Sequence, residues 1–126
     1  ETPEVTLVAY GGMASVVVEA AINAFYAEEI FSEILIPSAI KPFPISTLIN
    51  SIKNSKKAII VEESVKTGGW GAELSCQIYE SLFGYLECSI IRVGAEEMPI
   101  PSSALLEKQV LPQAGHVEKK IIEITR

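Results

Sequence analysis

The sequence predicts an α/β fold, a three-layer α/β/α sandwich built on a mostly parallel sheet. Four short apolar runs alternate with segments whose apolar residues recur at helical spacing. Glycine or proline follows the first two runs and stops them. The third run, around Ala58-Ile59-Ile60-Val61, is uninterrupted, which indicates a strand buried on both faces. Strand–helix alternation of this kind implies right-handed crossovers, parallel strands and helices on both faces of the sheet.

The expected elements follow one another along the whole chain. Ser46 is a candidate N-cap for a short second helix, and Thr67 or Ser64 for the helix after the third strand. Strands are expected at residues 5–10, 31–36, 58–63 and 89–93, and helices at 13–29, after 46, at 72–83, at 104–110 and after 112.

Length and charge narrow the class of protein. The 126 residues suit a single domain, 1–126, and 48% hydrophobic residues are ordinary for a globular fold. A net charge of -6 argues against a nucleic-acid partner, because neutralising phosphates requires a basic surface. No apolar stretch approaches the roughly 20 residues that span a bilayer. The start lacks both a signal peptide and an initiator Met, so we interpret the chain as a fragment of a longer protein. Cys76 and Cys88 are expected to be buried thiols and not a disulfide, which favours an intracellular compartment.

Gly11-Gly12 lies where the first strand passes into a helix, a common place for phosphate-binding loops. A dinucleotide fingerprint needs a further glycine in G-x-G-x-x-G, and Met13-Ala14-Ser15 does not supply it. We therefore favour a tight structural turn over a nucleotide site.

The most distinctive stretch runs from Glu62 to Glu73 and follows the third strand. Glu62 and Glu63 lie at the carboxyl edge of the sheet, where open α/β folds bind ligands. Paired carboxylates could serve a metal or acid–base chemistry, but neighbours on a strand point to opposite faces. We favour a capping role, in which a carboxylate accepts backbone N–H groups of the next loop or helix. Three glycines, Gly68, Gly69 and Gly71, would allow close backbone approach, and Trp70 between them is either a lid over the sheet edge or an interface anchor.

A catalytic set is not readable from the sequence. His116 is the single histidine and falls at the start of an amphipathic helix, where a surface position is expected. A triad would need a nucleophile and an orienting acid near it, and a zinc site would need further ligands. We therefore expect no catalytic, cofactor-binding or metal-binding residue in this chain.

The order and spacing of several motifs resemble one family. The chain resembles the C-terminal domain of the beta subunit of thiamine-dependent 2-oxo acid dehydrogenases, such as pyruvate, branched-chain 2-oxo acid or acetoin dehydrogenase, within the transketolase superfamily. The motifs are the strand-turn Val5–Gly12, Ile40-Lys41-Pro42, Val61-Glu62-Glu63 with Thr67–Glu73, and a proline motif of Pro99, Pro101, Glu107 and Pro112.

That resemblance implies an assembly role for this part of the enzyme. The parent enzyme would oxidatively decarboxylate a 2-oxo acid and transfer the acyl group to lipoyl. Thiamine diphosphate and magnesium would be held outside these residues, between the alpha subunit and the N-terminal domain of the beta subunit. This fragment alone is expected to be inactive, in a bacterial cytoplasm or a mitochondrial matrix.

The resemblance also implies partners. The domain would pair with its counterpart in an α₂β₂ assembly and offer acidic surface to the basic peripheral subunit-binding domain of the acyltransferase. Glu87 matches an acidic docking position, although a solvated carboxylate at a helix end is an equally open interpretation. Arg126 lies near that surface in the family's pattern.

Two other functions remain open from the sequence. One is a free-standing small-ligand or anion-binding module that uses the carboxyl edge near Gly11-Gly12 and Gly68–Gly71. The other is the equivalent domain of another transketolase-superfamily enzyme, such as a 2-oxo acid:ferredoxin oxidoreductase.

Overall fold

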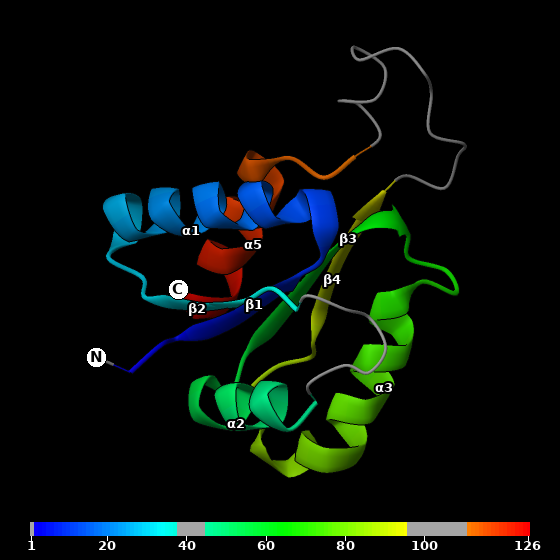
Figure 1. The fold of residues 1–126 in the computed structure, drawn as a ribbon. Coiled ribbons are helices and arrows are strands. Elements are labelled where there is room, and N and C mark those ends of the chain that lie inside the picture. The colour runs from blue at the N-terminus through cyan, green and yellow to red at the C-terminus, as the bar shows by residue number, and fades with distance from the viewer. Residues whose placement is uncertain (1, 38–44, 96–110) are drawn as a thin grey trace.

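The computed structural model describes residues 2–37, 45–95 and 111–126, except for the side chains of residues 64 and 65. Strands and helices alternate as the sequence predicts (Figure 1). The expected helix at 104–110 lies outside the described residues. The elements are β1 (Val5–Ala9), the short 3-10 turn η1 (Gly11–Met13), α1 (Ala14–Glu28), β2 (Ser32–Leu35), α2 (Ile45–Ser55), β3 (Ala58–Val65), α3 (Trp70–Leu82), the 3-10 turn η2 (Phe83–Tyr85), β4 (Ile91–Ala95) and α5 (Ala114–Thr125).

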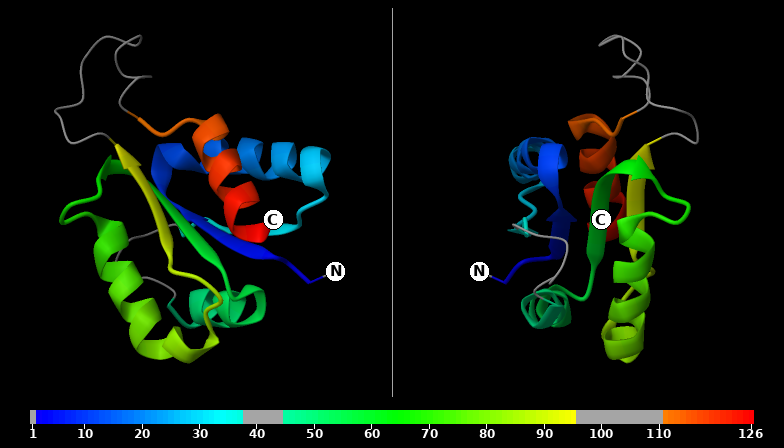
Figure 2. Two further views of the ribbon diagram at one scale, coloured as in Figure 1. Left: turned by 180° about the vertical axis from the view of Figure 1, so that it is seen from behind. Right: turned by 45° about the vertical axis from the view of Figure 1, so that its right-hand side comes forward.

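The four described strands form one parallel sheet in the order β2-β1-β3-β4. Helices α1 and α5 pack on one face, and α2 and α3 pack on the other (Figure 2). This arrangement confirms the predicted three-layer α/β fold. It also places β2 at one edge of the described sheet.

Side-chain alternation along the strands divides the core into two layers. Leu7 and Ile59 face α1 and α5, where they meet Val17 and Ile121. Val8 and Ile60, one residue further along, face α2 and α3. Because β1 and the first half of β3 are buried on both faces, their sequences read as apolar runs without polar alternation.

The single polar residue within β1 is satisfied by α2. Thr6 is fully buried, and its hydroxyl lies 2.8 Å from both Ser51 Oγ and Ser55 Oγ. Ser51 donates to Glu33, and Ser55 donates to the carbonyl oxygen of Lys57. This chain of hydroxyl groups fixes α2 against the sheet, because each buried hydroxyl has a partner.

The structure corrects several expected boundaries. Ser46 is not an N-cap, because α2 begins at Ile45 and contains it. Thr67 and Ser64 do not cap α3 either, since Gly69 occupies its N-cap position. Strand β4 begins at Ile91 and not at residue 89, and the N–H of Ile90 donates to the Tyr79 hydroxyl at 2.8 Å.

The expectation of two buried thiols is wrong. Cys76 is exposed and Cys88 half-buried, although both are free, as expected. Cys76 lies on the outer side of α3, because Leu74 and Ile78 turn inward. Its Sγ donates to Glu80 at 3.3 Å, and this hydrogen bond to a carboxylate raises the pKa of the thiol.

Candidate functional site

The carboxyl edge of the sheet is organised by two consecutive carboxylates at the end of β3. They diverge, as the alternation of a strand requires. Glu63 accepts a hydrogen bond at 2.7 Å from the backbone N–H of Gly12, in the turn η1 that leads into α1. Glu62 accepts one from the backbone N–H of Gly71, in the first turn of α3, at 3.2 Å. Each carboxylate therefore holds the beginning of a helix on its own face, which agrees with the capping interpretation.

Glycine leaves room where these carboxylates approach the backbone. A Cβ at Gly71 would overlap Glu62 Oε2 and lie 3.1 Å from Arg92 Nε. A Cβ at Gly12 would overlap Glu63 Oε1. Gly11 and Gly68 have φ values of +64° and +68°, which favour glycine for a different reason. The glycines are thus explained by close approach and by turn geometry.

Glu62 also forms an ion pair that the sequence analysis did not anticipate. Its carboxylate lies 3.2 Å from Arg92 on β4, and the Glu62 side chain is 4% exposed. Arg92 also donates to the carbonyl oxygen of Lys66, so it joins the strand end to the following loop. The buried carboxylate is compensated by a cation, a backbone N–H and the start of a helix.

Trp70 covers part of this edge. It is the first residue of α3 and is half-buried against the core on the α2–α3 side of the sheet. Its ring lies 6.2 Å from the ring of Tyr10, which follows β1. This position favours the lid interpretation over an interface anchor.

The polar groups at this edge do not fit magnesium or a diphosphate. Magnesium prefers converging carboxylate oxygens, and Glu62 and Glu63 point to opposite faces of the sheet. Within residues 2–37, 45–95 and 111–126, no three His, Cys, Asp or Glu residues gather into a possible metal site. A phosphate at the start of α1 or α3 would meet a carboxylate already bound to the backbone N–H there. His116 is exposed near the start of α5.

The predicted docking residue Glu87 lies at the opposite, amino-terminal edge of the sheet. Its carboxylate lies 3.9 Å from Lys57 Nζ, and the Glu87 side chain is 55% exposed. A groove of about 710 Å³ runs beside it. The groove is lined by Tyr79, Phe83, Leu86, Glu87, Cys88 and Ser89.

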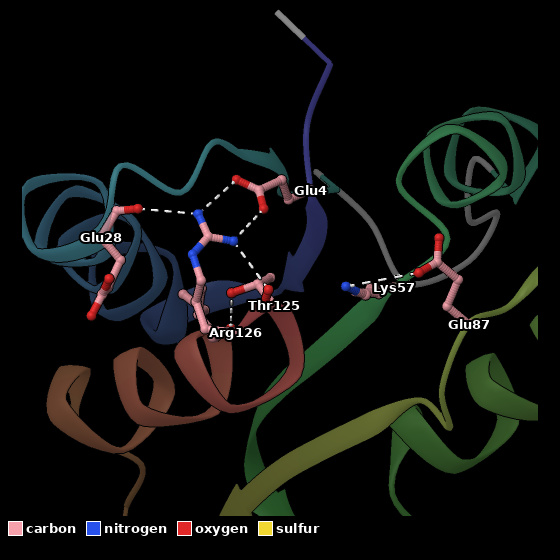
Figure 3. Close-up of polar contacts among 7 residues, drawn as sticks. Glu4, Glu28, Lys57, Glu87, Thr125 and Arg126 are labelled. Carbon is pink, nitrogen blue, oxygen red and sulfur yellow. Dashed lines mark hydrogen bonds and ion pairs between the residues drawn. The ribbon is translucent and has the colours of Figure 1, made fainter.

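Arg126 belongs to a separate cluster on the same edge. Its guanidinium donates to both carboxylate oxygens of Glu4, at 2.6 and 3.3 Å, and to the carbonyl oxygen of Glu28 at 3.1 Å. The hydrogen bond from Arg126 lowers the pKa of Glu4, and the same bond raises the pKa of Arg126. Figure 3 shows this cluster and the Lys57–Glu87 pair on either side of the start of β1. The structure therefore brings Arg126 and Glu87 to one edge but not into contact.

Most of the proline motif lies outside the residues that the structure describes. Pro99, Pro101 and Glu107 lie outside the described residues. Pro112 is buried immediately before α5. Across the described ranges, no helix is long and apolar enough to cross a membrane.

The fold defines a class of protein, an α/β domain with a parallel sheet between two layers of helices. The chain belongs to the transketolase C-terminal domain family, whose profile, "Transketolase, C-terminal domain", matches residues 1–117. The resemblance seen in the sequence is thereby confirmed.

Relatives of known name support the same assignment. The chain is 35% identical to a pyruvate dehydrogenase E1 component subunit beta of Gracilaria tenuistipitata var. liui, over 83% of this chain and 32% of that protein. It is 30% identical to the mitochondrial protein of that name from Dictyostelium discoideum, over 100% of this chain and 35% of that protein. A chloroplastic rice protein, subunit beta-3, is 32% identical over 95% of this chain and 30% of its own length. The chain thus spans about a third of the length of these relatives.

A solved structure has the same fold. The protein described as "Split gene transketolase, inactive beta4 tetramer" matches with a TM-score of 0.72 and 28% identity. The match covers 100% of this chain and 40% of that one. The transketolase C-terminal fold therefore accounts for all the described elements.

Proposed function

We propose that this chain is the assembly and docking domain of the beta subunit of a 2-oxo acid dehydrogenase complex. The parent enzyme would decarboxylate a 2-oxo acid and pass the acyl group to lipoyl, with thiamine diphosphate and magnesium held outside these residues. The observation that carries the proposal is that Glu62 and Glu63 both accept hydrogen bonds from backbone N–H groups. Both carboxylates at the edge where α/β folds bind ligands are engaged in holding helices.

The proposal has two kinds of partner. In an α₂β₂ assembly the domain would contact the alpha subunit and pair with a second beta subunit. The name of the structural relative, a beta4 tetramer, supports self-association in this family. A mitochondrial or bacterial cytoplasmic location is part of the same proposal, and the names of the relatives add chloroplasts.

Glu87 is proposed as the contact for a basic peripheral subunit-binding domain. Its side chain is more than half exposed and stands beside a groove with aromatic and aliphatic walls. Lys57 already neutralises part of the charge of Glu87, so a basic partner would share the Glu87 carboxylate with Lys57 or displace Lys57 from it. Arg126 would act indirectly in this surface, because its guanidinium is engaged with Glu4 and Glu28 at the end of α5.

Charge reversal tests the docking proposal. Glu87→Lys should weaken binding of a basic peripheral subunit-binding domain by about 2 kcal/mol, or about thirtyfold, in isothermal titration. Glu73→Lys is the matched control, because Glu73 is an exposed acid in the first turn of α3, at the other end of that helix. Equal affinities for the wild type and Glu87→Lys would refute the assignment. Retention of thiamine diphosphate by this chain alone would overturn the assembly role.

A second candidate function is the equivalent domain of another transketolase-superfamily enzyme. The match to the split-gene transketolase over the whole chain favours it. The anion-binding module is disfavoured, since carboxylates already occupy both helix starts that an anion would use. Micromolar binding of sugar phosphates in calorimetric titration would favour the anion-binding function instead.

A further inference from the structure

The groove beside Glu87 combines aromatic rings, an aliphatic wall and a carboxylate. Its volume is about 710 Å³, and residues of α3, η2 and the segment before β4 line it. Tyr79 and Phe83 supply two rings whose centroids lie 6.5 Å apart, with an angle of 56° between their planes. Leu86 and Glu87 line the same groove. One ligand can therefore meet apolar surface and a negative charge together.

The two rings differ in what holds them. The Tyr79 hydroxyl accepts a hydrogen bond from the backbone N–H of Ile90 at 2.8 Å, which fixes this ring against the start of β4. Phe83 is 77% exposed, so most of its apolar surface is in contact with water. Covering that surface would be favourable, because apolar area is removed from water. The Phe83 ring is thus available to a ligand beside a fixed neighbour.

The Glu87 carboxylate has room for another cation. Its Oε2 lies 3.9 Å from Lys57 Nζ, well beyond the roughly 2.7–2.9 Å of a charge-assisted hydrogen bond. Figure 3 shows that only one of the two oxygens faces Lys57. Within the described residues the carboxylate accepts no hydrogen bond, and the side chain is more than half exposed. Because an ionised carboxylate has about four acceptor positions, most of them remain open.

A cation over an aromatic ring already occurs beside the groove. Lys53 Nζ lies 4.7 Å from the centroid of the Tyr85 ring, and Tyr85 follows Phe83 by two residues. The faces of aromatic rings attract cations electrostatically, and a net charge of -6 adds a general attraction. Lys53 and Lys57 oppose a further cation nearby, however. A cationic ligand must therefore gain from the rings as well as from Glu87.

Among cationic side chains, arginine fits this combination better than lysine. The guanidinium group is planar, stacks on aromatic faces and donates two parallel N–H groups to a carboxylate. The lysine ammonium group is a strongly hydrated point charge, so it gains less from a ring. The methylene stem of an arginine would pack along the aliphatic wall at Leu86.

We propose that the groove binds an arginine side chain of a protein partner, with the guanidinium group between the Phe83 ring and the Glu87 carboxylate. This inference rests on the proposed docking of a basic domain at Glu87, and it specifies which basic residue docks there and what holds it. Glu87 supplies the charge, and Phe83 supplies the selection of arginine over lysine.

Nuclear magnetic resonance titration of the chain with two peptides tests the groove. The probes are acetyl-Ala-Arg-Ala-amide and acetyl-Ala-Lys-Ala-amide, which differ only in the cationic side chain. The arginine peptide should bind about fivefold more tightly, in line with the strength of cation–aromatic contacts at exposed sites. The δ-methylene protons of its arginine should shift upfield, because they would lie over a ring.

Substitutions separate the part played by the ring from the part played by the charge. Phe83→Leu should reduce the preference for arginine to within about twofold, because leucine keeps an apolar contact but has no ring. Tyr26→Leu is the matched control, since Tyr26 is an aromatic residue of similar exposure, 80%, on α1, and the full preference should remain. Glu87→Gln should weaken the binding of both peptides. All three side chains are more than half exposed, so the fold should survive.

The outcomes distinguish this inference from the docking proposal. Equal affinities of the wild type for the two peptides, or a preference that Phe83→Leu leaves intact, would overturn the arginine groove. So would the absence of binding by either peptide at about 20 mM, above the millimolar range of weak contacts. Docking at Glu87 would then stand if the subunit-binding domain still loses affinity for Glu87→Lys. Equal affinities of that domain for the wild type and Glu87→Lys refute the docking itself.

Discussion

At the scale of single residues, the close contact between Glu62 and Gly71 decides the form of the carboxyl edge. The carboxylate is almost fully buried, so it cannot move away from a larger neighbour. The Glu63–Gly12 contact differs, because Glu63 is exposed and its carboxylate can swing into solvent. A side chain added at Gly71 should therefore destabilise the fold more than one added at Gly12, although the two contacts have similar geometry.

Gly71→Ala should destabilise the chain by about 1–3 kcal/mol, the cost typical of a side chain forced into a packed site. Urea denaturation followed by circular dichroism measures the change. Gly115→Ala is the control, since a Cβ at Gly115 meets nothing within 4 Å. That substitution lies in α5 and should stabilise the chain by about 0.5–1 kcal/mol. Equal effects of the two substitutions would contradict the close contact.

The divergence of Glu62 and Glu63 could be predicted from the sequence, because side chains alternate along a strand. The partnership of Glu62 with Arg92 could not. Arg92 stands on β4 opposite Ile60, two residues before Glu62 and on the same face. Such a diagonal pair depends on strand order and register, which the sequence does not state. The buried Thr6 cluster was missed for the same reason, since its partners come from α2 and β2.

At the scale of elements, Arg126 joins three ends. It lies at the end of α5, its main partner Glu4 precedes β1, and Glu28 closes α1. The elements come together at the edge where Figure 3 shows the cluster. This edge is held by charge, whereas the interior is held by apolar contacts.

The pair should make stability depend on pH in a defined direction. The pKa of Glu4 lies below its ordinary value of 4.5 in the folded chain, so its contribution is present above that value. The contribution is lost as pH falls from the ordinary value through the lowered pKa, because in that range the unfolded state binds more protons than the folded state. Glu4→Gln should therefore lower the melting temperature at pH 7 and leave it nearly unchanged at pH 2. Thermal melts at both pH values check this.

Glu123→Gln serves as the control for that experiment. Glu123 forms an exposed pair with Lys120 on one helix, and such pairs contribute little. Its substitution should have almost no effect at either pH. If Glu4→Gln lowered the melting temperature by the same amount at pH 2 as at pH 7, the charge of the Glu4 carboxylate would not be what stabilises its contact with Arg126.

Elements were predictable where apolar periodicity is strong and less so at their ends. Helix α3 was expected from Ala72 but begins at Trp70, because Glu62, nine residues before Gly71 on the preceding strand, supplies the capping interaction. An N-cap side chain adjacent in sequence is therefore unnecessary. The groove beside Glu87 was not predicted at all, since Tyr79 and Phe83 are four residues apart and resemble a second core-facing stripe.

At the scale of the whole molecule, the Glu87 surface and most of the exposed apolar side chains lie on different sides. The Glu87 surface would attract a basic partner through charge, while six of the eight large apolar side chains that the described residues expose lie on α1 or around β2. Figures 1 and 2 show α1 and β2 on the side of the molecule away from α3. A basic partner docked at Glu87 would therefore leave that apolar side uncovered.

Salt should separate the charge of Glu87 from the aromatic ring beside it. Raising sodium chloride from about 50 to 500 mM should weaken docking at Glu87 by about tenfold, because salt screens exposed charges. The preference for the arginine peptide over the lysine peptide should stay within about twofold of its low-salt value, because the two peptides carry the same charge and are screened alike. Titration calorimetry with the domain and magnetic resonance titration with the peptides, at both concentrations, measure these responses. Loss of the preference at high salt would contradict stacking on Phe83.

The fold class and the family could be read from the sequence, and for different reasons. Alternating strand and helix patterns predict the fold, since few topologies satisfy them. The family depended on the order of short glycine and proline motifs, none of which is specific alone. Partner surfaces such as Glu87 remain predictions, because an exposed carboxylate looks the same whether it binds a protein or water.

The two carboxylates at the end of β3 also limit how this domain can be recombined. Glu62 contacts the start of α3 and Glu63 contacts the turn before α1, so one strand end carries one half of each of two contacts. A chimera that takes β3 from one parent and a helix start from another separates those halves. Deleting one residue of β3 before Glu62 would present each carboxylate to the wrong face. Crossovers within this family should therefore keep residues 11–71 together.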